Sequence, residues 1–451
     1  MKKTLYKIYG IAATALLAAA ASSCDNFLDI QPVGRVIITT AEEYRKMLTE
    51  AYSIVPEDRG LATFRGDEFV LNSTVSQEDL NSYLDIWLWD DVSPESTTAT
   101  FNWRSYYQVL YEANYLIESR DNITEGTTEE IDQLEGEAYM LRAYMHFLLV
   151  NLYGEPYTAL ADPYSSKAVP LKLDTDPYNV LSRNTVGEIY DQIISDMNRA
   201  EQLLNVEDWG EYRYRFNTLS VDALRSRVYL YMGRWEESLA ASRRVLEVKS
   251  TLSDVTTELP NHYQSVENIV ALEQVMTAYY DRAGKVSSEL YGLYDIAGDL
   301  RRTQYFNRQT SSNITVKKGG SNEYSCSFRV GEIYLNAAEA ALESSTGEDA
   351  LQAARGYLLT LMQSRYTASY YASREAAVNA MSREELREEI YAERRRELAF
   401  EGHRWFDLRR TTRPQLTKTY QGATYTLEQG DSRYTIRIPS AAIEANPNLA
   451  N

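Results

Sequence analysis

The side chains that could do chemistry in this sequence are chiefly aromatic and acidic. Its 451 residues include 36 Tyr, 10 Phe and 6 Trp, and 65 acidic against 46 basic residues. An aromatic ring can stack under the apolar face of a sugar, and a neighbouring Asp, Asn or Arg can hydrogen-bond the hydroxyls. The formal charge of −19 argues against a nucleic-acid backbone as partner, because such a partner requires a basic face.

Trp87 and Trp89 are the leading candidates for a sugar-binding platform. They stand two apart in residues 56–101, where Pro, Gly, Ser, Thr and Asp among aromatics indicate a long loop. Two such rings share one face of an extended segment. We expect both rings, with Asp67, to bind a glycan. The alternative, equally open, is that one or both plug the loop onto the core.

The histidines do not indicate a metal site or a catalytic site. His146, His262 and His403 are scattered without ligand spacing, and neither an HExxH nor a G-x-S-x-G motif is present. His146 lies in an apolar run and is expected to be a core residue. We therefore predict a protein that is not an enzyme.

The acidic residues allow more than one interpretation. Asp90–Asp91 and Asp67–Glu68 could hold Ca²⁺ with loop carbonyls, but no EF-hand spacing is present, so we predict no metal or cofactor. Glu393, Glu397 and Glu401 lie four apart on one predicted helix face. They could form an anion site or catalytic carboxylates, but a lattice of exposed ion pairs that pins the helix to its neighbours is favoured.

The elements that must position these residues are mostly helical. Four capping boxes predict helix starts, each a Ser or Thr with Glu three residues later: Thr40–Glu43, Thr127–Glu130, Thr185–Glu188 and Ser382–Glu385. The run from Val186 to Leu204 then places its apolar residues on one helix face.

The helices form candidate pairs. Residues 219–247 read as two helices around a tight Gly233-Arg234-Trp235 turn, a pattern typical of a tetratricopeptide unit. Two further pairs are 130–153 with 185–204, and 331–343 with 349–364. We predict a mostly α fold of tetratricopeptide-like pairs, an α–α superhelix that carries an irregular, loop-rich face with a few short strands. Candidate strands are Ile269–Leu272 and a pair formed by 422–427 and 433–438.

The N-terminus reads as a lipoprotein signal peptide, residues 1–23. Lys2, Lys3 and Lys7 precede a mostly apolar stretch, and small residues lead into Cys24, the position that a lipobox gives to the lipidated residue. Removing the leader takes away three lysines and no acids, so the charge becomes −22. Cys326 is then alone, and we expect it to be a buried small hydrophobe.

Four stretches together resemble the SusD/RagB family of Bacteroidetes outer-membrane lipoproteins. They are SCDNFLD at 23–29, GEAYMLRAYMHFLLVNLYGEPY at 136–157, FRVGEIYLNAAEAAL at 328–342, and IYAERRRELAFEGHRWFDLRR at 390–410, followed by Ile438-Pro439 and Asn446-Pro447-Asn448-Leu449. The resemblance spans nearly the whole mature chain. We divide that chain into an N-terminal SusD-like helical region, 24–250, and a C-terminal RagB/SusD region, 251–451, with a loop-rich insert and closing helices.

The resemblance implies a nutrient-binding role at the cell surface. The lipid on Cys24 would hold the protein on the outer membrane, facing the exterior. A glycan, or less often a peptide, would be captured and passed to a SusC-like TonB-dependent transporter. The resemblance also places the glycan site between the 56–101 segment and an insert around 275–295, which adds Tyr279 and Tyr280 as candidates. Rival interpretations are an exported glycoside hydrolase and a tetratricopeptide scaffold that binds only proteins.

Overall fold

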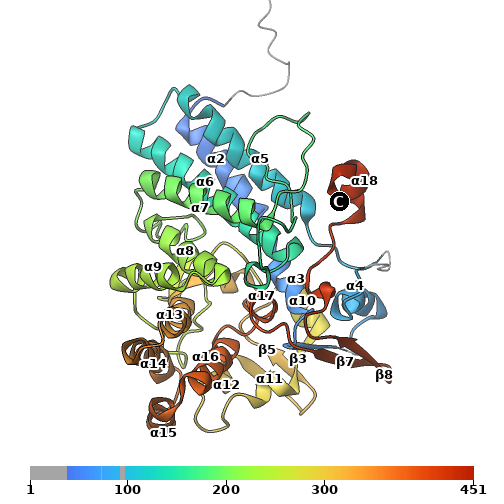
Figure 1. Cartoon of the computed structure of the whole chain (residues 1–451), viewed down its shortest axis with the longest axis vertical. Coiled ribbons are helices and arrows are strands. Elements are labelled where there is room, and N and C mark those ends of the chain that lie inside the picture. The colour runs from blue at the N-terminus through green and yellow to red at the C-terminus, as the bar shows by residue number, and fades with distance from the viewer. Residues whose placement is uncertain (1–37, 73, 92–96, 451) are drawn as a thin grey trace, which may run out of the picture.

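The computed structural model describes residues 38–72, 74–91 and 97–450 (Figure 1). The signal peptide and Cys24 lie outside the described residues. In the view of Figure 1 the long helices occupy the left of the molecule, and the labelled strands lie at the lower right. The fold is mostly α, as the sequence predicts.

The helices are α2 (Ala41–Ser53), α3 (Asp58–Thr63), α4 (Gln77–Trp87), α5 (Trp103–Ser119), α6 (Thr128–Tyr153), α7 (Val186–Leu203), α8 (Thr218–Met232), α9 (Trp235–Val248), α10 (Ala278–Ala283), α11 (Ser288–Gly292), α12 (Arg301–Gln304), α13 (Val330–Ser344), α14 (Glu348–Gln363), α15 (Ala368–Ala380), α16 (Arg383–Glu397), α17 (Arg404–Arg410) and α18 (Ser440–Ala445). Among the described residues, no helix combines the length and apolar character needed to cross a bilayer.

The strands form four antiparallel pairs: β1 (Phe69–Leu71) with β3 (Gly284–Val286), β2 (Asn268–Val270) with β6 (Phe328–Arg329), β4 (Phe306–Arg308) with β5 (Ile314–Val316), and β7 (Leu416–Tyr420) with β8 (Ala423–Leu427). Each strand is five residues or shorter. They fasten loops to the helical layer.

Local sequence signals account for the helix starts and for one sharp helix end. All four predicted capping boxes are present, at the starts of α2, α6, α7 and α16. Gly233 ends α8 with a φ of 71°, a left-handed conformation that glycine adopts without strain. The chain can therefore reverse directly into α9.

The predicted helix pairs are confirmed. Helix α6 packs against α7, α8 against α9, and α13 against α14, while α13 also contacts α9 and joins two of the pairs. Tyr residues act as large wedges between these helices, and Tyr44, Tyr106, Tyr144 and Tyr190 are all buried in the main core. Most of the described tyrosines lie in, or pack against, the two apolar clusters of the fold.

Two expectations about irregular segments are wrong. Residues 56–101 are not one long loop, because they contain α3, β1 and α4. The C-terminal strand pair has a different partner: β8 pairs with 416–420, and residues 432–434 form a short 3₁₀ turn. A two-residue turn at Gln421-Gly422, with φ of 49° and 82°, closes the hairpin and fixes this nearer register.

Candidate functional site

Residues far apart in the sequence meet where α4, α10, β1 and β3 come together, a surface that we call the α4–α10 face. Strand β1 pairs with β3 through Phe69–Val286, Val70–Lys285 and Leu71–Gly284. The Asn72 side-chain amide also donates to the Arg282 carbonyl at 2.9 Å. The structure therefore joins the two segments that carry the predicted aromatic residues (Figure 1).

Tyr279 is the open aromatic ring of the α4–α10 face. Its exposed fraction is 64%. The Arg282 guanidinium lies 5.1 Å from the ring centroid and 3.5 Å from a carboxylate oxygen of Asp79. A ring with a guanidinium and a carboxylate beside it can stack on a sugar and hydrogen-bond its hydroxyls.

Tyr280, the neighbour of Tyr279 on α10, packs against the core beneath the exposed surface. It is half-buried, and its ring lies edge-on to Phe64 and Tyr83, with centroid separations of 5.9 Å and 5.8 Å. Gly60 of α3 permits the approach of α10, because a Cβ there would lie 2.9 Å from the Tyr280 ring and 1.8 Å from the Val275 carbonyl oxygen. Tyr280 thus sets the position of Tyr279.

Trp87 and Trp89 do not lie on an exposed loop, and that expectation is wrong. Their exposed fractions are 3% and 1%. Trp87 donates its indole N–H to the Phe69 carbonyl at 3.2 Å, and Trp89 donates to the Arg65 carbonyl at 2.8 Å. Neither ring is open to a ligand in this arrangement. Instead they join α4 to the core, which is the alternative that the sequence left open.

Lys418 adds further contacts to the two buried indole rings. Its ammonium lies 5.0 Å and 4.1 Å from the Trp87 and Trp89 ring centroids and donates to the carbonyls of Phe64 and Trp87, both at 2.8 Å. Burial, reinforced by the Arg65 charge, lowers the pKa of Lys418 well below its usual value. Strand β7 is thereby fastened to the ends of α3 and α4, a contact that no sequence pattern indicated.

Asp67 is also engaged inside the protein. Its carboxylate accepts from Arg404 at 2.9 Å and 2.7 Å and lies 3.1 Å from Arg395. Burial opposes the charge, but these two guanidinium groups outweigh it and hold the pKa of Asp67 below its usual value. Among the residues that the structure describes, no cluster of three or more His, Cys, Asp or Glu has a metal-binding arrangement.

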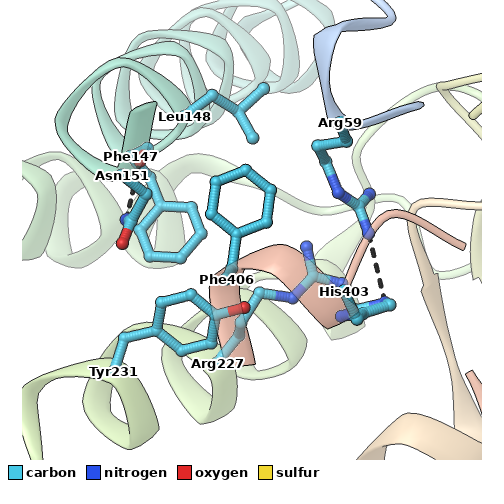
Figure 2. Close-up of a pocket in the computed structure, with 8 residues that line it drawn as sticks. All are labelled: Arg59, Phe147, Leu148, Asn151, Arg227, Tyr231, His403 and Phe406. Atoms are coloured by element: carbon cyan, nitrogen blue, oxygen red, sulfur yellow. Dashed lines mark hydrogen bonds between the residues drawn. The ribbon is translucent and has the colours of Figure 1, made fainter. Parts of the chain in front are cut away.

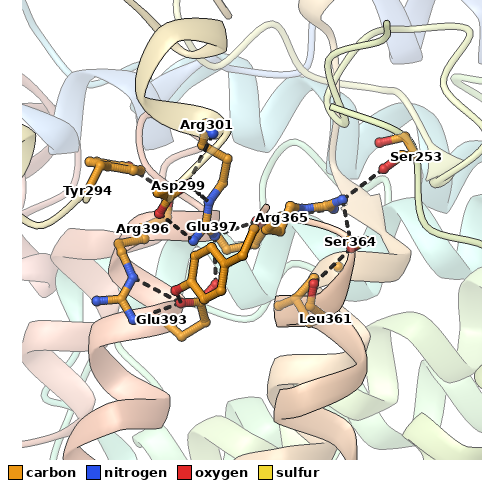
Figure 3. Close-up of polar contacts among 12 residues, drawn as sticks. Ser253, Tyr294, Asp299, Arg301, Leu361, Ser364, Arg365, Glu393, Arg396 and Glu397 are labelled. Carbon is orange, nitrogen blue, oxygen red and sulfur yellow. Dashed lines mark hydrogen bonds and ion pairs between the residues drawn. The ribbon is translucent and has the colours of Figure 1, made fainter. Parts of the chain in front are cut away.

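The three regularly spaced glutamates are buried in an ion network rather than exposed in a lattice. Figure 3 shows two of them, Glu393 and Glu397, among their arginine partners. Arg301 reaches Glu393 at 2.7 Å and Glu397 at 2.8 Å, and Arg365 reaches Glu397 at 2.9 Å. Despite burial, the Arg365, Arg329 and Arg301 charges hold the pKa of Glu397 well below its usual value. Carboxylates saturated by arginines in this way are suited to fixing α16, not to proton transfer.

The internal cavity of Figure 2 is too small for a ligand. Its volume is about 10 Å³, roughly the space for one water. Arg59 lies 3.1 Å from His403 Nε2, and burial lowers the pKa of His403 well below its usual value. His403 is therefore neutral and can accept from Arg59. His146 and Cys326 are buried as expected.

Two family models together match residues 26–450 of the chain. One, described as "Starch-binding associating with outer membrane", matches residues 26–230, and the other, "SusD family", matches residues 226–450. The chain belongs to the SusD/RagB family.

Individual relatives agree with this assignment. SusD-like protein P38 of Formosa agariphila is 25% identical over 224 residues, which are 49% of this chain but only 41% of that protein. A SusD superfamily protein from Bacteroides fragilis has 22% identity and a TM-score of 0.76, covering 92% of this chain and 100% of that one. A laminarin-binding SusD-like protein has 19% identity and a TM-score of 0.61, covering 83% and 92%. The solved structures support the tetratricopeptide-like helical fold.

The three internal motifs that carry the SusD/RagB resemblance, at 136–157, 328–342 and 390–410, are joined to one another and to other helices by buried contacts. Arg394 of the third internal motif donates to Asn336 of the second at 2.7 Å, and Arg410 pairs with Glu339. Arg142 of the first binds Asp196 at 2.6 Å. These residues join the helices to one another, so they identify the family without identifying a ligand.

Proposed function

We propose that this protein is a cell-surface lipoprotein that binds an oligosaccharide without making or breaking a bond. Its membership of the SusD/RagB family supports the role, and a relative of the same fold is named as laminarin-binding. The observation that carries the site is the open Tyr279 ring with Arg282 and Asp79 beside it. A peptide is the second ligand class that this face could take.

Delivery and anchoring complete the proposal. The lipid on Cys24 would hold the protein on the outer membrane, facing outward, and the bound ligand would pass to a SusC-like TonB-dependent transporter. A Cys24→Ala variant should fail to incorporate labelled fatty acid and should leave the membrane fraction. Continued incorporation would contradict lipidation at this residue. The partner is tested by asking whether a SusC-like transporter from the same cells co-purifies with the full-length lipoprotein.

The glycan site is tested with Tyr279→Ala. A glycan array that includes laminarin first identifies a ligand, and calorimetry then measures its affinity. Loss of one stacked ring costs on the order of 1 kcal/mol, so we expect affinity to fall about fivefold or more. Tyr178→Ala is the matched control, because Tyr178 is 88% exposed on another segment.

Two results would contradict the proposal. Unchanged affinity in Tyr279→Ala would remove the site from the α4–α10 face. The appearance of reducing ends when the purified protein meets its glycan would indicate a hydrolase instead.

A further inference from the structure

A groove separate from the α4–α10 face lies between the N-terminal end of α8 and the C-terminal end of α9. Its volume is about 640 Å³, within the range of roughly 300–1,000 Å³ that is typical of ligand sites. Trp209, Leu219, Val248 and Ile269 supply apolar lining. Figure 1 places α8 and α9 on the side of the molecule away from α4 and α10.

Two cations in this groove form no close ion pair with any carboxylate of the described residues. Arg213 donates only to backbone carbonyls, those of Gly210 at 3.3 Å and Ser265 at 3.0 Å. Within the described part of the chain, neither Arg213 nor Lys249 forms an ion pair with a carboxylate. Burial and the charge of Arg213, partly offset by Asp208, lower the pKa of Lys249. A bound anion would relieve this repulsion.

A buried acceptor in the same groove lacks a donor. Asn268 is 5% exposed and lines the groove. Its amide nitrogen donates to the His262 and Tyr263 carbonyls, at 2.7 Å and 3.2 Å. Its side-chain oxygen has no hydrogen-bond partner among the described residues. An unsatisfied buried acceptor costs about 1–3 kcal/mol, and a rotation of the Asn268 side chain that opened this oxygen to the groove would let a ligand hydroxyl donate to it.

The charges around the groove decide which anion fits. Asp222 is already paired with Arg244 at 2.6 Å, while Glu207, Asp208 and Glu247 are exposed at the rim. These rim carboxylates would repel a densely charged polyanion but can accept hydrogen bonds from hydroxyl groups. The groove therefore favours a ligand with one carboxylate among many hydroxyls.

We propose that this groove binds a carboxylated sugar, a uronic acid within an oligosaccharide. Its carboxylate would lie between Arg213 and Lys249, and its hydroxyls would donate to the exposed carboxylates of the groove. The apolar lining would cover the sugar face. This site is separate from the α4–α10 face and does not depend on it.

Calorimetry on the mature chain tests the proposal with two sugar acids that each carry one carboxylate, glucuronosyl-xylobiose and galacturonosyl-rhamnose, each against its methyl ester. We expect at least one acid to bind at least tenfold more tightly than its ester, and to bind more weakly at 200 mM than at 50 mM salt. Lys249→Gln should weaken acid binding about tenfold, because it removes the charge but keeps a polar side chain that can donate hydrogen bonds. Lys167→Gln, the same change at an exposed site, should have no effect.

The outcomes separate this groove from the first site and from a peptide site. Tyr279→Ala should leave acid binding unchanged. Equal affinity for acid and ester, unchanged binding in Lys249→Gln with an unchanged melting temperature, or no binding of either acid at millimolar concentration would overturn the proposal. Tighter binding of trialanine, through its terminal carboxylate, than of either sugar acid would also overturn it and indicate a peptide site.

Discussion

Replacing Glu393 with Gln tests whether the buried carboxylates of α16 hold the fold together. Glu393 is fully buried, and its carboxylate accepts from Arg301 at 2.7 Å, Arg396 at 2.7 Å and the Tyr366 hydroxyl at 2.7 Å. Glutamine keeps the shape of the side chain but removes its charge. The substitution therefore leaves two guanidinium groups short of a buried counter-ion.

The size of the effect follows from the pKa. Burial would raise the pKa of Glu393, but Arg301 and Arg396 outweigh burial and lower it from 4.5 to about 2. At about 1.4 kcal/mol per pH unit, this difference gives about 3 kcal/mol of stability at pH 7. Removing one partner of a buried ion pair costs about 3–5 kcal/mol in other proteins, which agrees.

The pH dependence has a definite sign. Because the folded-state pKa of Glu393 lies below the unfolded-state value, its contribution is fully present above about pH 5 and is lost as the pH falls toward 2. About 2 kcal/mol should remain at pH 3.5 by the same relation. The deficit of Glu393→Gln relative to wild type should shrink accordingly.

Urea unfolding at pH 7 and pH 3.5 measures both quantities. Glu388→Gln is the matched control, since it makes the same change at an exposed position on the same helix and should shift stability by less than about 0.5 kcal/mol. Two results would show that the buried network does not stabilise the fold. One is that Glu393→Gln loses no more stability than Glu388→Gln at pH 7. The other is that the stability difference between Glu393→Gln and wild type does not become smaller at pH 3.5.

Three further substitutions test the region around the α4–α10 face. Gly60→Ala puts a methyl group 1.8 Å from the Val275 carbonyl oxygen, so it should lower stability by at least about 1–3 kcal/mol and weaken glycan binding together, as thermal melts and calorimetry would show. Burial raises the pKa of Asp58 to about 7, so the folded protein binds a proton there that the unfolded chain has already lost. The contribution of Asp58 to the free energy of unfolding should therefore fall by about 4 kcal/mol between pH 4 and pH 8. Asp58→Asn should remove this dependence in urea titrations. Trp89→Phe removes the bond to the Arg65 carbonyl and should cost about 1–3 kcal/mol in denaturation, yet leave the affinity of the folded protein for its glycan unchanged.

The helical layer was predictable because its signals are local. A capping box needs only residues three apart, and Gly233 marks the reversal between α8 and α9 without reference to the rest of the chain. Apolar periodicity then shows which face of each helix is buried. These signals depend on no distant contact, so they appear in the sequence alone.

The α4–α10 face was only partly predictable, because distant pairing builds it. Strands β1 and β3 have three residues each and lie more than 200 positions apart. The error over Trp87 and Trp89 has a local cause. Ser76 caps α4 by accepting from the Asp79 backbone N–H at 3.1 Å, and this cap was the signal that could have identified a helix there.

The ion network shows what spacing leaves undetermined. The four-residue interval of Glu393, Glu397 and Glu401 predicts a shared face, but not whether that face is buried. Burial follows from arginines that arrive from elsewhere, Arg301 and Arg365 among them. Exposed pairs are worth a few tenths of a kcal/mol, whereas these buried groups become costly when one partner is removed.

The residues that identify the family and the residues that would meet a ligand are different sets. Arg394 and Arg410 form buried contacts between helices, and a change in either would disturb the scaffold common to the family. Tyr279, in contrast, is exposed to solvent, and Lys249 lines an open groove. A strong family resemblance therefore predicts the fold closely, while the ligand has to be argued from the charge and exposure of a few side chains that no motif contains.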